Sequence, residues 1–113
     1  MKILDNSDKF LLRVIPRIVT EKLGAETAGI KFIGGGSFGR VYAVTLVSSQ
    51  VIAVKAYRVQ GSQHDEAQQL SILAENTDVK MPQVLFTYED EDTAILGMTF
   101  VEGKNALDPM FLF

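Results

Sequence analysis

Clustered glycines, a lysine within an apolar run and a glutamate shortly after it could together bind a phosphate group. The glycines occupy the stretch "FIGGGSFGRVYAV", which fits the pattern G-x-G-x-x-G-x-V from Gly34 to Val41. Glycine tolerates positive φ angles and lets backbone amides approach phosphate oxygens closely. The stretch predicts a phosphate-binding turn made of Gly34, Gly35, Gly36, Ser37, Phe38 and Gly39.

Two of the three common phosphate-binding loops do not fit this stretch. A P-loop requires a lysine and a hydroxyl residue directly after its last glycine, but Arg40 and Val41 follow Gly39. A dinucleotide-binding loop must open a helix and needs an acidic residue about 20 positions later. The residues after Gly39 favour a strand, and no acidic residue lies between Glu26 and Asp65. The remaining possibility is a glycine-rich hairpin, whose two strands fold over the phosphates of ATP.

The charged residues that would complete such a site are Lys55 and Glu66. Lys55 lies in the apolar run "VIAVKAY", where the burial of an unpaired ammonium is costly, so it needs an anion and a carboxylate as partners. We expect Glu66, on a following helix, to supply that carboxylate. Asp65 is a rival, and Glu75 is a more distant one that lies half a turn out of phase with Glu66.

Two small apolar residues, one shortly after the last glycine of the stretch and one just before the lysine, predict a slot for a flat ring. We expect Val41 and Ala53 to form the roof of this slot, with Ala53 small enough for a ring to fit beneath it. The pattern therefore favours a nucleotide as the phosphate-bearing ligand.

An amphipathic helix precedes the glycine stretch. Its apolar stripe has helical spacing and consists of Leu11, Leu12, Ile15, Ile18, Val19 and Leu23. Ser7 or Asp8 could cap its start, and Gly24 suits its end. Pro16 lacks an amide donor and crowds the preceding turn, so we expect it to kink the helix or to split it in two.

The rest of the chain predicts an α+β fold. Segments rich in β-branched residues indicate strands at 30–33, 41–48, 50–57, 83–88 and 93–100, with an acidic hairpin turn at 89–92. A helix is expected at 63–75, where Glu66 would share its inward face with Leu70 and Leu73. The sum is a five-stranded antiparallel sheet with one inserted helix, preceded by the N-terminal helix.

Composition narrows the class of protein. A chain of 113 residues with 47% apolar residues fits one domain. The net charge of −3 argues against nucleic acid as the main partner, and the absence of cysteine excludes thiol chemistry and disulfides. No secretory signal is recognisable, and no apolar run approaches the roughly 18 residues of a membrane span. We expect a cytoplasmic protein with no membrane partner.

At these residues the chain resembles the N-terminal lobe of the aminoglycoside phosphotransferase and choline kinase family, a branch of the protein-kinase-like fold. The resemblance covers Gly34 to Gly103 and rests on the stretches "GGGSFGRVYAV", "IAVK", "DEAQQLSILAE", "MPQVLFTYED" and "LGMTFVEG". In that family, a helix bearing the lysine-pairing glutamate leads to a proline-led strand and then to a last strand that enters the hinge between two lobes.

The resemblance implies contacts with each part of ATP. Lys55 would bind the α- and β-phosphates and Glu66 would orient it, so that the two form the catalytic pair, while the glycine loop shields the γ-phosphate. Met98 matches the residue behind the adenine ring. Thr99 and Val101 match the hinge positions whose backbone carbonyl and amide bind the edge of the base.

The resemblance also implies an activity, which is transfer of the γ-phosphate of ATP to a hydroxyl group of a small molecule. The family's catalytic base and Mg²⁺ ligands belong to a C-terminal lobe, whereas this chain stops at residue 113. We therefore expect a helical segment at 1–27, the nucleotide-binding lobe at 28–103, and at 104–113 the hinge exit with the truncated start of a second lobe. Such a chain should bind ATP weakly and show no turnover, and its apolar end could dock on another surface or self-associate.

Two alternatives stay open at this point. The same lobe could belong to a protein kinase, although "MPQVLF" followed by "FVEG" favours the small-molecule branch. The second alternative is a noncatalytic interaction module that keeps the sheet but need not bind ATP.

Overall fold

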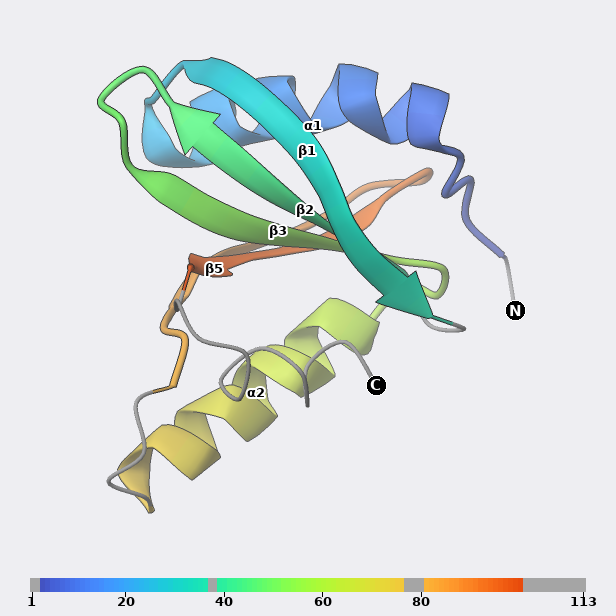
Figure 1. Cartoon of the computed structure of the whole chain (residues 1–113). Helices are drawn as coiled ribbons and strands as arrows, with labels where there is room; N and C mark the ends of the chain where they lie inside the picture. Colours follow the sequence, from blue (N-terminus) through green and yellow to red (C-terminus); the bar gives the residue numbers. More distant parts are fainter. Residues whose placement is uncertain (1–2, 37–38, 77–80, 101–113) are drawn as a thin grey trace.

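The computed structural model describes residues 3–36, 39–76 and 81–100 (Figure 1). Its elements are helix α1 (Asp8–Leu23), strands β1 (Thr27–Gly36), β2 (Gly39–Leu46) and β3 (Val51–Tyr57), helix α2 (Ser62–Glu75), and strands β4 (Val84–Glu89) and β5 (Ala94–Thr99). The strands form one antiparallel five-stranded sheet in the order β1-β2-β3-β5-β4. The structure confirms the predicted α+β fold, in which α1 precedes the strands along the chain and α2 is inserted after β3.

Helix α1 covers one face of the sheet (Figure 1). Its N-cap Ser7 accepts a hydrogen bond from the amide of Phe10, and its C-cap Gly24 has a φ of 65°, a left-handed conformation that suits glycine. The helix runs without a break through Pro16, so the expected split does not occur. Packing of the apolar face stabilises a helix more than local propensity does, which accounts for the tolerated proline.

The buried stripe of α1 is rotated around the helix relative to the stripe that its sequence suggests. Its buried residues have the spacing i, i+3, i+4, i+7 and i+8 and are Leu11, Val14, Ile15, Ile18 and Val19. Leu12 was expected in this stripe, but it is 38% exposed, because it lies beyond the edge of the stripe that Val19 forms. Val14, which the sequence analysis left out, takes its place. The stripe packs against apolar residues of the sheet, namely Tyr42, Val44, Leu46, Ile52, Val54, Ala56, Phe86 and Ile95.

Helix α2 lies on the opposite face of the sheet, as Figure 1 shows. A second and smaller apolar cluster occurs there, comprising Leu4, Ala53, Tyr57, Leu70, Ala94, Leu96 and Met98. The buried residues of α2 are Gln63 and Leu70. The expectation that Leu73 faces inward is wrong, since Leu73 is 50% and its neighbour Ile72 52% exposed.

The glycine stretch is part of a regular hairpin. We expected a strand only at 30–33, but β1 continues to Gly36, which pairs with Gly39 of β2. The pairing register shifts between Phe32 and Gly34. The hairpin therefore brings Gly34 opposite Val41, and β2 pairs with β3 from Gly39, opposite Tyr57, to Thr45, opposite Val51.

The acidic run between β4 and β5 forms the expected turn. The carboxylate of Asp90 accepts hydrogen bonds from the amides of Asp92 and Thr93, from the Thr93 hydroxyl and from the Tyr88 phenol, all between 2.7 and 2.8 Å. Burial by itself would raise the pKa of Asp90, but the hydrogen bonds from Thr93, Tyr88 and Asp92 lower the pKa overall. Within residues 3–36, 39–76 and 81–100, no helix is long and apolar enough to cross a membrane.

Candidate functional site

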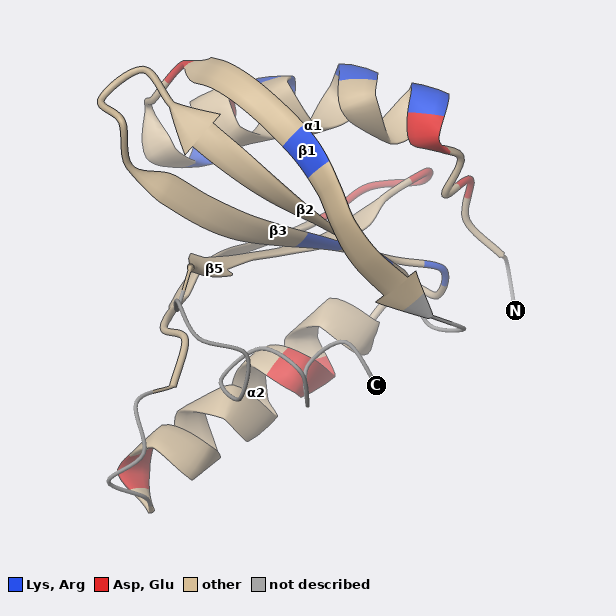
Figure 2. Cartoon of the chain, viewed as in Figure 1, with Lys and Arg blue, Asp and Glu red and all other residues tan. Residues whose placement is uncertain are grey.

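A buried ion pair joins β3 to α2. The ammonium of Lys55 lies 2.9 Å from Oε1 of Glu66, and the two side chains are only 2% and 12% exposed. Figure 2 shows the basic position of β3 within a sheet whose strands carry few charges, and the acidic positions of α2, the helix on one face of that sheet. The rival carboxylates Asp65 and Glu75 are on the exposed surface of α2. The sequence thus predicted the ion pair and its partner.

A third side chain, Tyr57, completes this cluster. Its hydroxyl donates a hydrogen bond to the same Glu66 oxygen at 2.6 Å, and its ring centroid lies 5.1 Å from the Lys55 ammonium. Burial, followed by the nearby Glu66 carboxylate, raises the pKa of Tyr57, so the phenol remains protonated. The sequence analysis missed this residue. The available signal was its spacing, because residues i and i+2 of a strand share one face.

The apolar residues predicted around the base gather beside the ion pair. Val41 is paired in register with Lys55, and Ala53 with Met98, so the four positions lie in adjacent rows of one face. We expected Val41 and Ala53 to form the roof of an apolar slot for a flat ring. In the structure their exposed fractions are 1% and 0%, and Met98 is 1% exposed.

The glycines of the hairpin have a packing role that the sequence analysis did not foresee. A Cβ atom at Gly39 would lie 2.2 Å from the carbonyl oxygen of Ala56, and one at Gly35 would lie 2.8 Å from the carbonyl oxygen of Gly39. Close backbone approach therefore explains both glycines. Positive φ does not, since among the described residues the glycines with positive φ are Gly24 and Gly61.

Some predicted contact residues fall outside the described part of the chain. These are Ser37 and Phe38 of the loop and Val101 of the expected hinge. Thr99, the other hinge position, ends β5. Its amide donates to the carbonyl oxygen of Gln83 at 2.9 Å, and its hydroxyl accepts from the amide of Gln83 at 2.8 Å. These bonds fix the strand end where the resemblance places the base.

The start of α2 is held by a second polar cluster. Gln63 is fully buried, and its amide nitrogen donates to a Glu89 carboxylate oxygen at 3.0 Å and to the Tyr88 carbonyl oxygen at 3.3 Å. The backbone amide of Gly61 donates to both the Gln63 and the Glu89 side chains. Nothing local in the sequence marks Gln63 as buried, because its partners lie 25 and 26 residues away.

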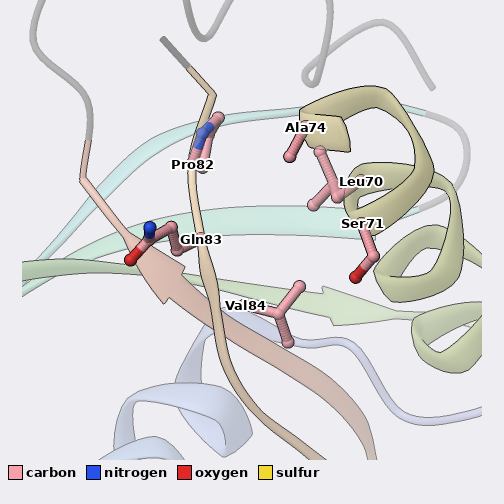
Figure 3. A pocket seen from close by; sticks show the side chains of 6 residues that line it. All are labelled: Leu70, Ser71, Ala74, Pro82, Gln83 and Val84. Carbon is pink, nitrogen blue, oxygen red and sulfur yellow. The ribbon is translucent and has the colours of Figure 1, made fainter. Parts of the chain in front are cut away.

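The second half of α2 borders a groove (Figure 3). The groove has a volume of about 270 Å³ and is lined by Leu70, Ser71, Ala74, Pro82, Gln83 and Val84. In Figure 3 the Gln83 side chain points away from the helix, so the walls that face each other are mainly apolar.

A comparable polar cluster lies on the α1 face. The Tyr42 hydroxyl donates to an Asp8 carboxylate oxygen at 2.7 Å, and the Arg40 guanidinium contacts both residues. Burial, followed by the hydrogen bond to Asp8, raises the pKa of Tyr42 despite the opposing effect of Arg40. This cluster connects the start of α1 to β2. Like the Lys55 cluster, it contains a hydrogen bond from a tyrosine hydroxyl to a carboxylate.

Across the described ranges, no group of three or more histidine, cysteine, aspartate or glutamate residues could hold a metal ion. A scan of the chain against protein-family models finds no match, and a search of the curated proteins finds no relative. The function is therefore argued from the site itself together with the resemblance of its motifs.

Proposed function

We propose that this chain is the nucleotide-binding lobe of an ATP-dependent phosphotransferase that acts on a hydroxyl group of a small molecule. The observation that carries the proposal is the buried Lys55–Glu66 ion pair at 2.9 Å, on the sheet face that also holds the end of the glycine hairpin. A buried ion pair is weak evidence for stability, because desolvation offsets much of the attraction. Its placement next to a glycine-rich hairpin supports a binding role instead.

The donor set fits a nucleotide phosphate. The Lys55 ammonium supplies positive charge in a place that excludes water, where it interacts strongly with an anion. Glu66 holds that ammonium at the sheet, and in this proposal backbone amides of the glycine hairpin would supply further donors to the phosphates. When bound, ATP supplies the phosphoryl group that is transferred, and catalysis in this class depends on positioning and charge neutralisation.

Each remaining residue has a role that follows from its place. Val41, Ala53 and Met98 form a buried apolar surface next to Lys55, and a flat base would have to expose this surface in order to pack against it. The Thr99 carbonyl would bind the edge of that base. Among the residues that the structure describes we assign no Mg²⁺ ligand, since Glu66, the carboxylate beside Lys55, already accepts hydrogen bonds from Lys55 and Tyr57.

The acceptor class rests on the resemblance of "MPQVLF" and "FVEG" to the small-molecule branch. A noncatalytic module with the same sheet would keep the ion pair but would not need to bind ATP. Nucleotide binding therefore separates the two functions.

Calorimetric titration with magnesium-ATP tests the proposal. We expect weak binding, with a Kd of about 0.1–1 mM, because the described residues supply one side of the expected site. Lys55→Met should weaken binding about tenfold or more, through loss of the charge that faces the phosphates. Lys9→Met is the matched control, because Lys9 is exposed on α1, and it should bind like the wild type. Absence of binding, or equal affinity of the Lys55→Met variant, would refute the proposal.

A further inference from the structure

We infer that Tyr57 is a positioning residue that holds Glu66 against Lys55 and keeps α2 docked on the sheet before any nucleotide binds. The effect on nucleotide affinity rests on the proposed function, whereas the effect on the ion pair does not.

The geometry places Tyr57 in contact with both members of the ion pair. Its hydroxyl and the Lys55 ammonium donate to the same oxygen, Oε1 of Glu66, at 2.6 and 2.9 Å. The Tyr57 ring also faces the ammonium, with 5.1 Å between the ring centroid and the nitrogen, a favourable cation–π distance. Tyr57 is only 3% exposed, so water does not compete readily for either contact.

Helix α2 has few other attachments to the sheet. Its buried residues are Gln63 and Leu70, and Glu66 lies between them at the spacing i, i+3, i+7, which places all three on one face. Gln63 fixes the start of the helix through Glu89, and Leu70 packs in the apolar cluster. Glu66 is thus the middle of three attachment points, and Tyr57 supplies one of its two hydrogen-bond donors described above.

An anion that binds Lys55 must compete with the Glu66 carboxylate for the same ammonium. When an anion approaches the ammonium, the Lys55–Glu66 bond competes with the new contact. The hydrogen bond from Tyr57 does not compete, because a neutral phenol has no charge to give to the anion, and the raised pKa keeps that phenol protonated. Glu66, and with it α2, therefore stays in place while Lys55 binds the ligand.

The α1 face provides a matched control. Tyr42 is also fully buried, and its hydroxyl donates to the Asp8 carboxylate at 2.7 Å. Tyr42→Phe and Tyr57→Phe each delete one hydroxyl from a tyrosine–carboxylate bond, so their costs to global stability should be similar. They differ in the face of the sheet that they affect.

The test measures the Lys55 ammonium directly, by ¹⁵N NMR of the chain with labelled lysine, in the wild type and both variants. A paired and buried ammonium exchanges its protons slowly. In Tyr57→Phe we expect the Lys55 signal to shift and its proton exchange to accelerate about tenfold, the factor expected for loss of one hydrogen bond. In Tyr42→Phe the signal should be unchanged. An unchanged Lys55 signal in Tyr57→Phe, or an equal change in Tyr42→Phe, would overturn the inference.

Magnesium-ATP titration of the same samples separates the inference from the proposed function. We expect Tyr57→Phe to bind about three- to tenfold more weakly than Tyr42→Phe. If the Lys55 signal responds as expected but the wild type binds no ATP, Tyr57 still positions the ion pair and the nucleotide proposal is wrong. If the wild type binds ATP and Tyr57→Phe binds it equally well with an unaltered Lys55 signal, Tyr57 does not have this role.

Discussion

The two faces of the sheet are built differently. On the α1 face, the buried positions of the helix and the sheet are apolar, and the polar cluster of Asp8, Arg40 and Tyr42 lies at the start of the helix. On the α2 face, a lysine and a glutamine are among the most buried side chains. The α1 face has the composition of a stabilising core. The α2 face contains buried polar groups whose desolvation is unfavourable.

The two helices show the same contrast. Helix α1 has a side-chain cap at its start and a left-handed glycine at its end, and five of its residues are buried. Helix α2 has no side-chain cap at Gly61, and only two of its residues are buried. Weakly packed elements open at low free energy, and ligand-binding segments are commonly drawn from them. The comparison indicates that α1 mainly stabilises the fold, whereas α2 mainly positions Glu66 in the candidate site.

Apolar substitutions should separate the two helices most strongly. Ile18 of α1 is fully buried, so Ile18→Ala should destabilise the protein by about 4 kcal/mol, from lost transfer energy and a cavity. Leu73→Ala on α2 should change stability by less than about 0.5 kcal/mol, because Leu73 is half exposed. Urea denaturation gives both values. Comparable losses in the two variants would remove the proposed division between stabilising and functional faces.

Breaking the ion pair should have the next largest effect. Glu66→Gln removes the negative charge opposite the buried Lys55 ammonium and should cost about 3 kcal/mol. Lys55→Met should cost less, since the Tyr57 hydroxyl still binds Glu66 and the Glu66 side chain is partly exposed. The double variant should recover part of the loss relative to Glu66→Gln alone. A double-mutant cycle in urea measures the coupling, and zero coupling would mean that the pair contributes nothing to α2 docking.

The hairpin glycines offer a smaller test. Gly39→Ala should destabilise by about 2 kcal/mol through overpacking, because its Cβ would meet the carbonyl oxygen of Ala56. Gly29 is the matched control on β1, where a Cβ meets nothing within 4 Å, and Gly29→Ala should be neutral or slightly stabilising. Thermal denaturation of the two variants checks this difference. Equal melting temperatures would show that the hairpin tolerates a side chain at 39.

The hydrogen-bonded turn at Asp90 should give the smallest effect. Its lowered pKa means that the ionised carboxylate stabilises the folded state above the unfolded pKa of about 4, and that this contribution disappears as pH falls through the lower folded pKa. Asp90→Asn should therefore cost about 1 kcal/mol at pH 7, a value kept low by solvent screening. The difference from the wild type should shrink below about pH 4. A difference that grows on acidification would show that the sign of the pKa shift is wrong.

The sequence predicted those features that depend on local patterns. The strands, both helices and the turn at 89–92 follow from spacing and turn chemistry. The ion pair could be predicted because burying the Lys55 ammonium without a carboxylate partner is unfavourable. The errors at Leu12 and Leu73 arise because a sequence shows which residues are apolar, but only packing decides which of them lie on the buried face of a helix.

The features that the sequence did not predict depend on distant contacts. Tyr57 is read as one more apolar strand residue until Glu66 is placed beside its hydroxyl. Gln63 is read as a solvated helix residue until β4 supplies Tyr88 and Glu89. The packing role of Gly39 requires the position of the Ala56 carbonyl on the neighbouring strand. In each case the partner belongs to an element that the local pattern does not specify.

Amide hydrogen exchange with and without magnesium-ATP tests the central claim most directly, because it observes both faces of the sheet in one experiment. Without ligand, α2 should exchange faster than α1, since it has fewer buried attachments. At a nucleotide concentration of about 10 mM, well above the expected Kd, protection should increase in the β1–β2 hairpin, in β3 around Lys55 and in α2, and should stay unchanged in α1. Protection confined to α1, or no change on the α2 face, would contradict the assignment of that face to nucleotide binding.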